Sequence, residues 1–183
     1  MCRPGHRPSE HIYVLKSVFI KHQAQKKPLI AACFDLRKMF DSEDLYDCLN
    51  QVYLSEVTGK LYRLLFQMNK NVRLTIQTPV GDTPSANTGP IVTQGGVDGA
   101  VMSSVSIGND VSDAFKEKED EYEVKYENVQ LSPLLFLDDI LRCSDTVESA
   151  NYVNKLLEKV ISKKGLEFNS EKSMFIVMGN KKA

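Results

Sequence analysis

The chain has 183 residues, 42% hydrophobic and 26% charged, which is enough for one domain with its own core. With 23 basic and 24 acidic residues the net charge is −1, so the strongly basic composition of many nucleic-acid-binding domains is absent. The start of the chain lacks the apolar stretch of a secretory signal, and no apolar run approaches the roughly 20 residues of a membrane span. We therefore expect an intracellular protein with no membrane partner.

The first part of the chain predicts helices around one buried strand. Residues 9–25 have apolar positions at helical spacing. Residues 28–34 form a continuous apolar run, typical of a strand covered on both faces, and this run leads directly into Asp35. A second helix follows with Ser42 as its expected cap, and a third begins at Thr58.

In the middle of the chain the apolar period changes. Apolar and polar residues alternate from Asn71, and a turn sequence follows, which predicts a hairpin. Gly95 and Gly96 then precede a predicted helix rich in small residues, which allow another backbone or a ligand to approach closely. A charged stretch comes next, and the alternation over residues 122–126 predicts a further strand.

Two adjacent carboxylates, Asp138 and Asp139, interrupt an apolar stretch near the end of the chain. An isolated ionised carboxylate is costly to bury unless it is paired or bound to a metal. If this pair forms the turn between strands 134–137 and 140–143, both acids leave the core at the end of the sheet. Asp35 ends another strand of that sheet. Three converging carboxylates repel one another, which predicts a hard divalent cation among them.

The remaining elements complete a regular order. Thr146 can cap a helix that Gly165 ends, and residues 173–179 predict a last buried strand. The fold class is therefore α+β, with an antiparallel sheet in a split βαββαβ, ferredoxin-like arrangement and helices on one face. The N-terminal helix and the middle hairpin remain as a second, smaller lobe.

Five ordered sequence blocks resemble those of reverse transcriptases. "FDLRKMFDS" and "FLDDI" resemble the A and C motifs, "TGPIVTQGG" the B motif and "GLEFNSEKS" motif D, while "HRPSEHIYVLKSV" is similar to the segment before the palm in polymerases of non-LTR retrotransposons. The resemblance covers nearly the whole chain. It implies a single reverse transcriptase domain over 1–183, with 1–28 and about 71–93 as partial fingers, 29–70 and 94–179 as a polymerase palm, and no thumb.

The resemblance also implies a chemistry and a site. An RNA-directed DNA polymerase core adds deoxynucleotides to a primer 3′-hydroxyl by two-metal phosphoryl transfer, with two Mg²⁺ ions, or Mn²⁺ in their place. Its partners would be an RNA template, a DNA primer and deoxynucleoside triphosphates. The implied catalytic and metal-binding residues are Asp35, Asp138 and Asp139, with the Leu36 carbonyl as a further ligand. The implied nucleotide contacts are Phe40, Gln94, Gly95 and Lys172.

Each of these contacts also has an ordinary structural explanation. Phe40 suits a core aromatic ring as well as a sugar gate, Gln94 and Gly95 suit a turn before a helix, and Lys172 suits a solvated surface. Leu137 before the acid pair and Asp98 after Gln-Gly depart from the family's usual residues. We expect the chain to belong to a longer polyprotein with thumb and endonuclease segments. The alternative is a catalytically inactive fragment that acts as a binding or interaction module.

Overall fold

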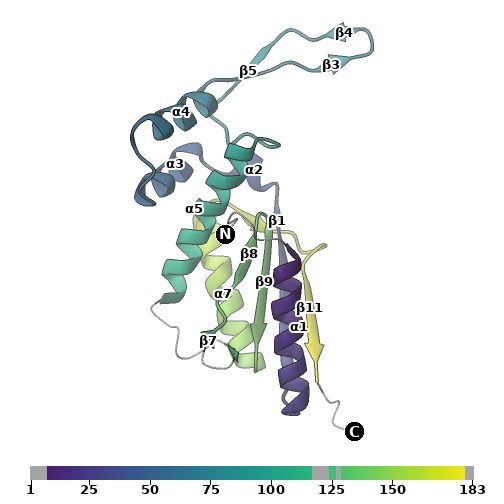
Figure 1. The fold of residues 1–183 in the computed structure, drawn as a ribbon. Helices are drawn as coiled ribbons and strands as arrows, with labels where there is room; N and C mark the ends of the chain where they lie inside the picture. Colours follow the sequence, from purple (N-terminus) through teal and green to yellow (C-terminus); the bar gives the residue numbers. More distant parts are fainter. Residues whose placement is uncertain (1–7, 117–123, 127–128, 180–183) are drawn as a thin grey trace. The chain divides into compact units, whose positions relative to one another are not determined.

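The computed structural model describes residues 8–116, 124–126 and 129–179 and has an α+β fold (Figure 1). It divides into two compact units. Unit 1 contains Met1–Arg37 and Ile107–Ala183, and unit 2 contains Lys38–Ser106. No helix in the described ranges combines the length and the apolar character that crossing a bilayer requires.

Unit 1 is built on an antiparallel sheet. Its central strand β1 pairs on one side with β9, which pairs in turn with β8, and on the other side with β11 and, at its last two residues, with β10. The sheet order is therefore β8, β9, β1, β11. The strands span Leu29–Arg37 (β1), Leu134–Phe136 (β8), Asp139–Ser144 (β9), Glu167–Phe168 (β10) and Met174–Met178 (β11). A separate pair, β6 (Lys125–Tyr126) and β7 (Val129–Gln130), lies outside this sheet.

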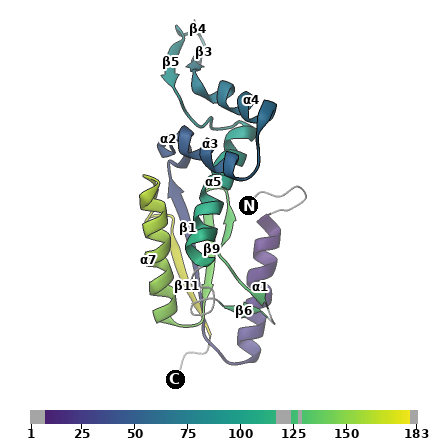
Figure 2. The ribbon, with the colours of Figure 1, turned by 90° about the vertical axis from the view of Figure 1, so that its left-hand side faces the viewer.

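Helices cover both faces of this sheet. Side chains alternate along β1, so Ile30, Ala32 and Phe34 share one face, and Figure 2 shows α7 (Val147–Lys163) and α1 (Pro8–Ala24) on opposite sides. Val18 of α1 packs against Leu29, on the face that also carries Asp35. The prediction of helices on one face is therefore incomplete, because α1 covers the start of β1 from the other side.

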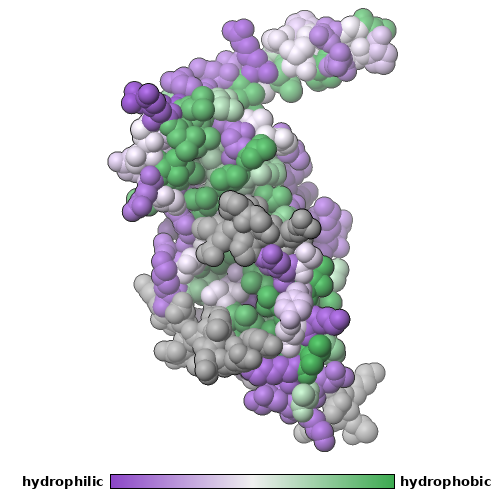
Figure 3. All heavy atoms as spheres, viewed as in Figure 1, coloured by the Kyte–Doolittle hydropathy of each residue, from purple (hydrophilic) through white to green (hydrophobic). Residues whose placement is uncertain are grey.

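Unit 2 consists of short helices and a hairpin. Four of its helices pack around a small apolar core, and an open apolar groove of about 450 Å³ is lined by residues of three of them. Figure 3 shows apolar side chains gathered in this part of the chain. The hairpin joins β2 to β5 and carries β3 and β4 at its tip. The elements are α2 (Met39–Ser42), α3 (Leu45–Leu54), α4 (Gly59–Lys70), β2 (Val72–Leu74), β3 (Gln77–Thr78), β4 (Gly81–Asp82), β5 (Ala86–Gly89) and the start of α5 (Val97–Lys116).

Several predicted boundaries are confirmed. Thr146 caps α7, because its hydroxyl accepts a bond from the Ser149 backbone N–H at 3.1 Å, and Gly165 follows the helix with a φ of +73°. The hairpin that begins near Asn71 and the helix after Gly95 and Gly96 are also present. Of the strand predicted at 122–126, residues 122 and 123 lie outside the described residues, and β6 occupies 125–126.

Two local predictions are wrong. The cap of α3 is Asp44 rather than Ser42, because the Asp44 carboxylate accepts from the Asp47 backbone N–H at 2.9 Å, while Ser42 ends α2. The last strand is exposed rather than buried. Because β11 is an edge strand of the sheet, its apolar side chains Met174, Phe175, Ile176 and Val177 are each 43–74% exposed.

Candidate active site

Asp35 and Asp139 face each other across two paired strands of unit 1. The register of β1 and β9 sets them directly opposite, with Phe34 opposite Ile140 one step earlier. Directly opposed residues of an antiparallel pair point to the same face of the sheet, with Cα atoms about 4.5 to 5.5 Å apart. Two carboxylates more than 100 residues apart in the sequence are therefore neighbours in space.

The third carboxylate, Asp138, lies in the turn between β8 and β9. Phe136 pairs with Asp139, so the two turn residues are Leu137 and Asp138, not Asp138 and Asp139 as the sequence predicted. Leu137 has a φ of +54°, a left-handed conformation that costs a residue with a Cβ about 1 to 2 kcal/mol. The Leu36 backbone N–H donates to the Asp138 carbonyl at 3.0 Å, which holds the turn against the end of β1.

A turn after β10 brings Lys172 to the same place. The Asn169 backbone N–H donates to the Asp35 carbonyl at 2.8 Å, and the Asp35 backbone N–H donates to Ser173 Oγ at 3.3 Å. Between these two anchors, Lys172 Nζ lies 3.5 Å from Asp35 Oδ1, and the Asp35 side chain is only 15% exposed. Lys172 thus balances part of the negative charge of the acids.

The pKa of Asp139 shows that the carboxylates interact. Burial raises the pKa of Asp139 above its ordinary value, the negative charges of Asp138 and Asp35 raise it further, and Lys172 partly lowers it. Burial, and then the charge of Asp139, also raise the pKa of the neighbouring Cys33 thiol. The acids therefore form one electrostatic cluster, and the thiol beside it is neutral at neutral pH.

The cluster has the donor chemistry of a magnesium site but is not fully assembled as one. Carboxylate oxygens are the ligands that Mg²⁺ takes from proteins, and mutually repelling carboxylates gain from a cation between them. Within the described part of the chain, however, no three His, Cys, Asp or Glu side chains are arranged to hold a metal ion. Asp35 instead points an oxygen at Lys172. The backbone of Leu36, the fourth predicted ligand, adjoins this cluster through its bond to Asp138.

The other predicted contacts belong to unit 2. Phe40 is half-buried and packs against the apolar core that contains Leu45 and Met102, as a core aromatic does. Gln94 and Gly95 form an exposed turn directly before α5, and Gly95 has a φ of +84°, which favours glycine. Gln94 and Gly95 are therefore accessible to a ligand, while Phe40 is partly enclosed.

Residues that the sequence interpretation did not single out support these turns. Ser173 and Asn169 hold the Lys172 turn against Asp35, and Asn69 bonds to the segment before α5. Short polar residues in turns are common, so their presence alone does not mark a functional site. The "FNSEKS" stretch was the available clue, since it placed Asn169 and Ser173 on either side of Lys172.

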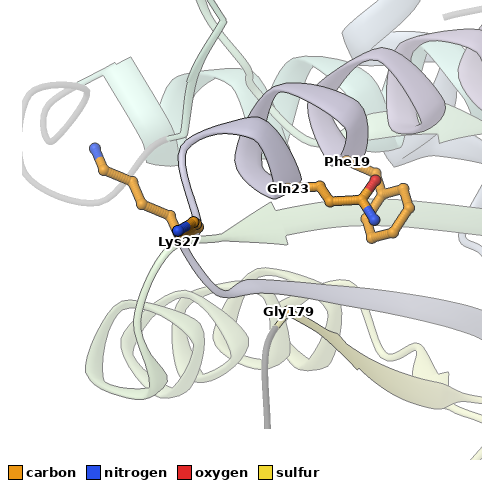
Figure 4. A pocket seen from close by; sticks show the side chains of 5 residues that line it. Phe19, Gln23, Lys27 and Gly179 are labelled. Atoms are coloured by element: carbon orange, nitrogen blue, oxygen red, sulfur yellow. The ribbon is translucent and has the colours of Figure 1, made fainter. Parts of the chain in front are cut away.

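A hollow at the end of α1 is too small to compete as a nucleotide site. Figure 4 shows Phe19 and Gln23 of α1 side by side, with Gly179 on the chain beyond β11. Two lysines, Lys26 and Lys27, complete the lining of this hollow of about 150 Å³. Pockets for organic ligands usually enclose about 300 to 1,000 Å³. This hollow therefore offers no alternative nucleotide site.

Comparison with known proteins gives matches only at the level of structure. No protein-family model and no curated protein sequence matches the chain. A solved apo telomerase of Candida tropicalis, truncated from its C-terminal domain, matches with a TM-score of 0.68 at 13% identity over 95% of this chain. The telomerase of Candida albicans, solved with a TWJ fragment of telomeric RNA, matches with a TM-score of 0.69 at 12% identity over 97% of this chain.

The chain has the fold of the matching part of these telomerase structures. Similarity at this level of identity establishes the fold alone. The chain spans 35% and 31% of the two telomerase chains, about a third of each. The two structures named above are telomerases, so they share a fold with the chain but do not show the retrotransposon type that the motif resemblance implies.

Proposed function

We propose that this chain is part of an RNA-directed DNA polymerase that adds deoxynucleotides to the 3′-hydroxyl of a primer. The observation that carries the proposal is the pairing of Asp35 with Asp139 at the end of the central sheet, beside Asp138 and Lys172. The reverse-transcriptase-like fold and the order of the sequence blocks support it. The sheet order β8, β9, β1, β11 is that of a split βαββαβ unit, which favours a polymerase palm with a ferredoxin-like sheet.

In this proposal the acids hold divalent cations. Asp35 and Asp138 are the principal ligands, and Asp139 and the Leu36 carbonyl complete the set. Two magnesium ions, when bound, supply the charge neutralisation that an in-line phosphoryl transfer requires. Lys172 lies against Asp35, so it would release that carboxylate to a cation and turn its ammonium group to the phosphates of the nucleotide. Gln94 and Gly95 contact the incoming nucleotide, and Phe40 limits the space at its sugar.

The partners follow from the same reaction. They are an RNA template, a DNA primer and deoxynucleoside triphosphates, and the Candida albicans neighbour was solved with an RNA fragment. The motif resemblance favours a non-LTR retrotransposon origin. We also propose an intracellular location. Because the chain corresponds to about a third of the telomerase chains it matches, we propose that it works within a longer polyprotein that adds thumb and endonuclease segments.

Primer extension tests the proposal. The chain, joined to a thumb segment of a reverse transcriptase, is incubated with an oligo(dT) primer on poly(rA), dTTP and Mg²⁺ or Mn²⁺, and the primer length is measured on a gel. We expect metal-dependent extension that Asp35→Asn reduces at least about 100-fold, since it removes a metal ligand. The control Asp82→Asn changes an exposed aspartate on β4 and should leave extension intact. Extension that Asp35→Asn does not affect would contradict the assignment.

A second candidate function is a binding module without catalysis. The ion pair of Lys172 with Asp35 and the lack of a three-ligand metal arrangement among the described residues favour it. The same primer–template, labelled with a fluorophore, separates the two candidates by anisotropy. Binding without extension at millimolar Mn²⁺ supports the binding module, and binding with extension supports the polymerase.

A further inference from the structure

The side chain of Asn69 joins three segments of unit 2. Asn69 lies near the end of α4 and is 0% exposed. Its Nδ2 donates to the Leu65 carbonyl and to Asp98 Oδ2, each at 3.0 Å. Its Oδ1 accepts from the Thr93 backbone N–H at 3.3 Å and from Thr93 Oγ1 at 2.9 Å. One buried amide therefore binds the residues on both sides of Gln94 and Gly95.

The chemistry of the partners fixes the orientation of this amide. A backbone N–H can only donate, and a backbone carbonyl can only accept, so Oδ1 must face Thr93 and Nδ2 must face Leu65. Nδ2 uses its second hydrogen on the Asp98 carboxylate, and such charge-assisted bonds are stronger than neutral ones. The Asn69 carbonyl also accepts from the Ile91 backbone N–H at 3.1 Å, which anchors the chain two residues before Thr93.

Glycines allow the segment between Thr93 and Gly99 to fold closely on itself. A Cβ on Gly99 would lie 2.1 Å from the Thr93 carbonyl oxygen, and a Cβ on Gly96 would lie 2.5 Å from Asp98 Oδ1. The segment from Thr93 to Gly99 is thus folded closely on itself, and Asn69 bonds to it at Thr93 and Asp98. This contact also explains Asp98, whose charge departs from the family pattern but is used within the protein.

We propose that Asn69 is a positioning residue that sets the geometry of the Thr93–Gly99 segment and thereby the placement of Gln94 and Gly95. The effect on a nucleotide rests on the proposed function of these two residues, whereas the effect on the segment does not. The thermodynamic reason is that a buried amide with all its bonds made is costly to disturb, so the segment keeps one conformation before a ligand arrives. A preformed contact loses less entropy on binding.

Two measurements on the whole chain test this inference. Hydrogen–deuterium exchange, read on peptides over residues 91–100, reports the segment itself. Titration calorimetry with dTTP and Mn²⁺ reports its consequence for a nucleotide. We expect Asn69→Ala to speed exchange over 93–99 and to weaken dTTP binding about tenfold. The matched control Asn50→Ala changes an exposed asparagine on α3 of the same unit and should alter neither.

If Asn69→Ala unfolds unit 2, a second set of variants still tests the inference. These variants exchange the amide of Asn69 and the carboxylate of Asp98. Asn69→Asp places a carboxylate against that of Asp98 and should loosen the segment, whereas Asp98→Asn alone still offers an oxygen to Asn69. In the double variant, the new amide at position 98 can donate to the new carboxylate at position 69, so the bond returns with donor and acceptor reversed. We expect the double variant to recover part of the protection and of the affinity, because only the bond to Leu65 stays lost.

Each outcome decides a separate claim. Unchanged exchange over 93–99 in Asn69→Ala and Asn69→Asp overturns the positioning role, and so does a loosened segment that binds dTTP as tightly as before. Absence of rescue in the double variant overturns the role of the Asp98 bond. If the unaltered chain binds no dTTP, the proposed function fails at Gln94 and Gly95, and the exchange data alone decide whether Asn69 holds the segment.

Discussion

At the scale of single residues, the acid cluster is a source of instability in the chain without a cation. Asp139 stands directly opposite Asp35, and like charges in this position destabilise a sheet. The raised pKa of Asp139 expresses the same repulsion together with partial burial. Retaining such an arrangement is typical of functional sites, where stability is lost in favour of binding.

The first prediction concerns this repulsion. Because the folded state raises the pKa of Asp139 above the unfolded value near 3.8, folding is favoured at low pH and loses that contribution as the pH rises through the folded pKa. Asp139→Asn should therefore raise the unfolding temperature at pH 7 by about 1 to 3 °C. The advantage should disappear below about pH 3, where the Asp139 carboxyl is protonated and neutral like the amide that replaces it. Thermal unfolding between pH 3 and 8 measures it, and an advantage that grows toward acid pH would contradict this explanation.

A second residue-scale prediction concerns the turn beside the acids. Asparagine tolerates the left-handed conformation of Leu137 better than leucine does. Leu137→Asn should therefore be about 1 kcal/mol more stable to urea unfolding than Leu137→Ala, which loses the same apolar side chain but retains the backbone cost. Equal stability of the two variants would show that the turn is not strained at this position.

At the scale of elements, the sequence patterns predicted which strand and which hairpin carry the acids, but not the turn residues or the buried side-chain contacts. A buried strand that leads into Asp35 and a hairpin at the acid pair both follow from apolar runs and are present, although β1 continues two residues beyond Asp35 to Arg37. The turn is displaced by one residue because no glycine or asparagine marks it, and Leu137 adopts the left-handed conformation instead. The buried amide of Asn69 leaves no periodic signal, since its partners are set by the tertiary fold.

The exposure of β11 could not be predicted from the sequence either, because an apolar run alone does not distinguish a central strand from an edge strand. β11 lies at the edge of the sheet with four exposed apolar side chains in a row. Such edges pair readily with other chains.

A prediction for β11 follows from this edge. Val177→Lys places a charge on the edge strand, at a side chain that is 74% exposed, and should reduce self-association at high protein concentration. Light scattering against concentration measures it. The control Val80→Lys changes a 98% exposed valine in the hairpin turn of unit 2, outside any apolar edge. Equal effects of the two variants would point to net charge rather than to the edge.

At the scale of the whole molecule, the proposed functions fall on separate compact units. The acids and Lys172 belong to unit 1, while Phe40, Gln94 and Gly95 belong to unit 2. The α+β class with an antiparallel sheet was predictable because the apolar runs of its strands and the stripes of its helices are local and ordered along the chain. Among the described residues no three side chains are arranged to hold a metal ion. The sequence could not predict this, because it depends on the side-chain conformations around Lys172, which forms an ion pair with Asp35.

The most direct test of the central claim is where a divalent cation binds. Mn²⁺ broadens the amide NMR signals of nearby residues and can be added in small amounts to the labelled chain. We predict that the first signals to broaden are those around Asp35, Asp138, Asp139 and Lys172, and that excess Mg²⁺ restores them. Asp35→Asn should require at least about tenfold more Mn²⁺. Broadening that begins elsewhere, or is the same in Asp35→Asn, would contradict a shared metal site.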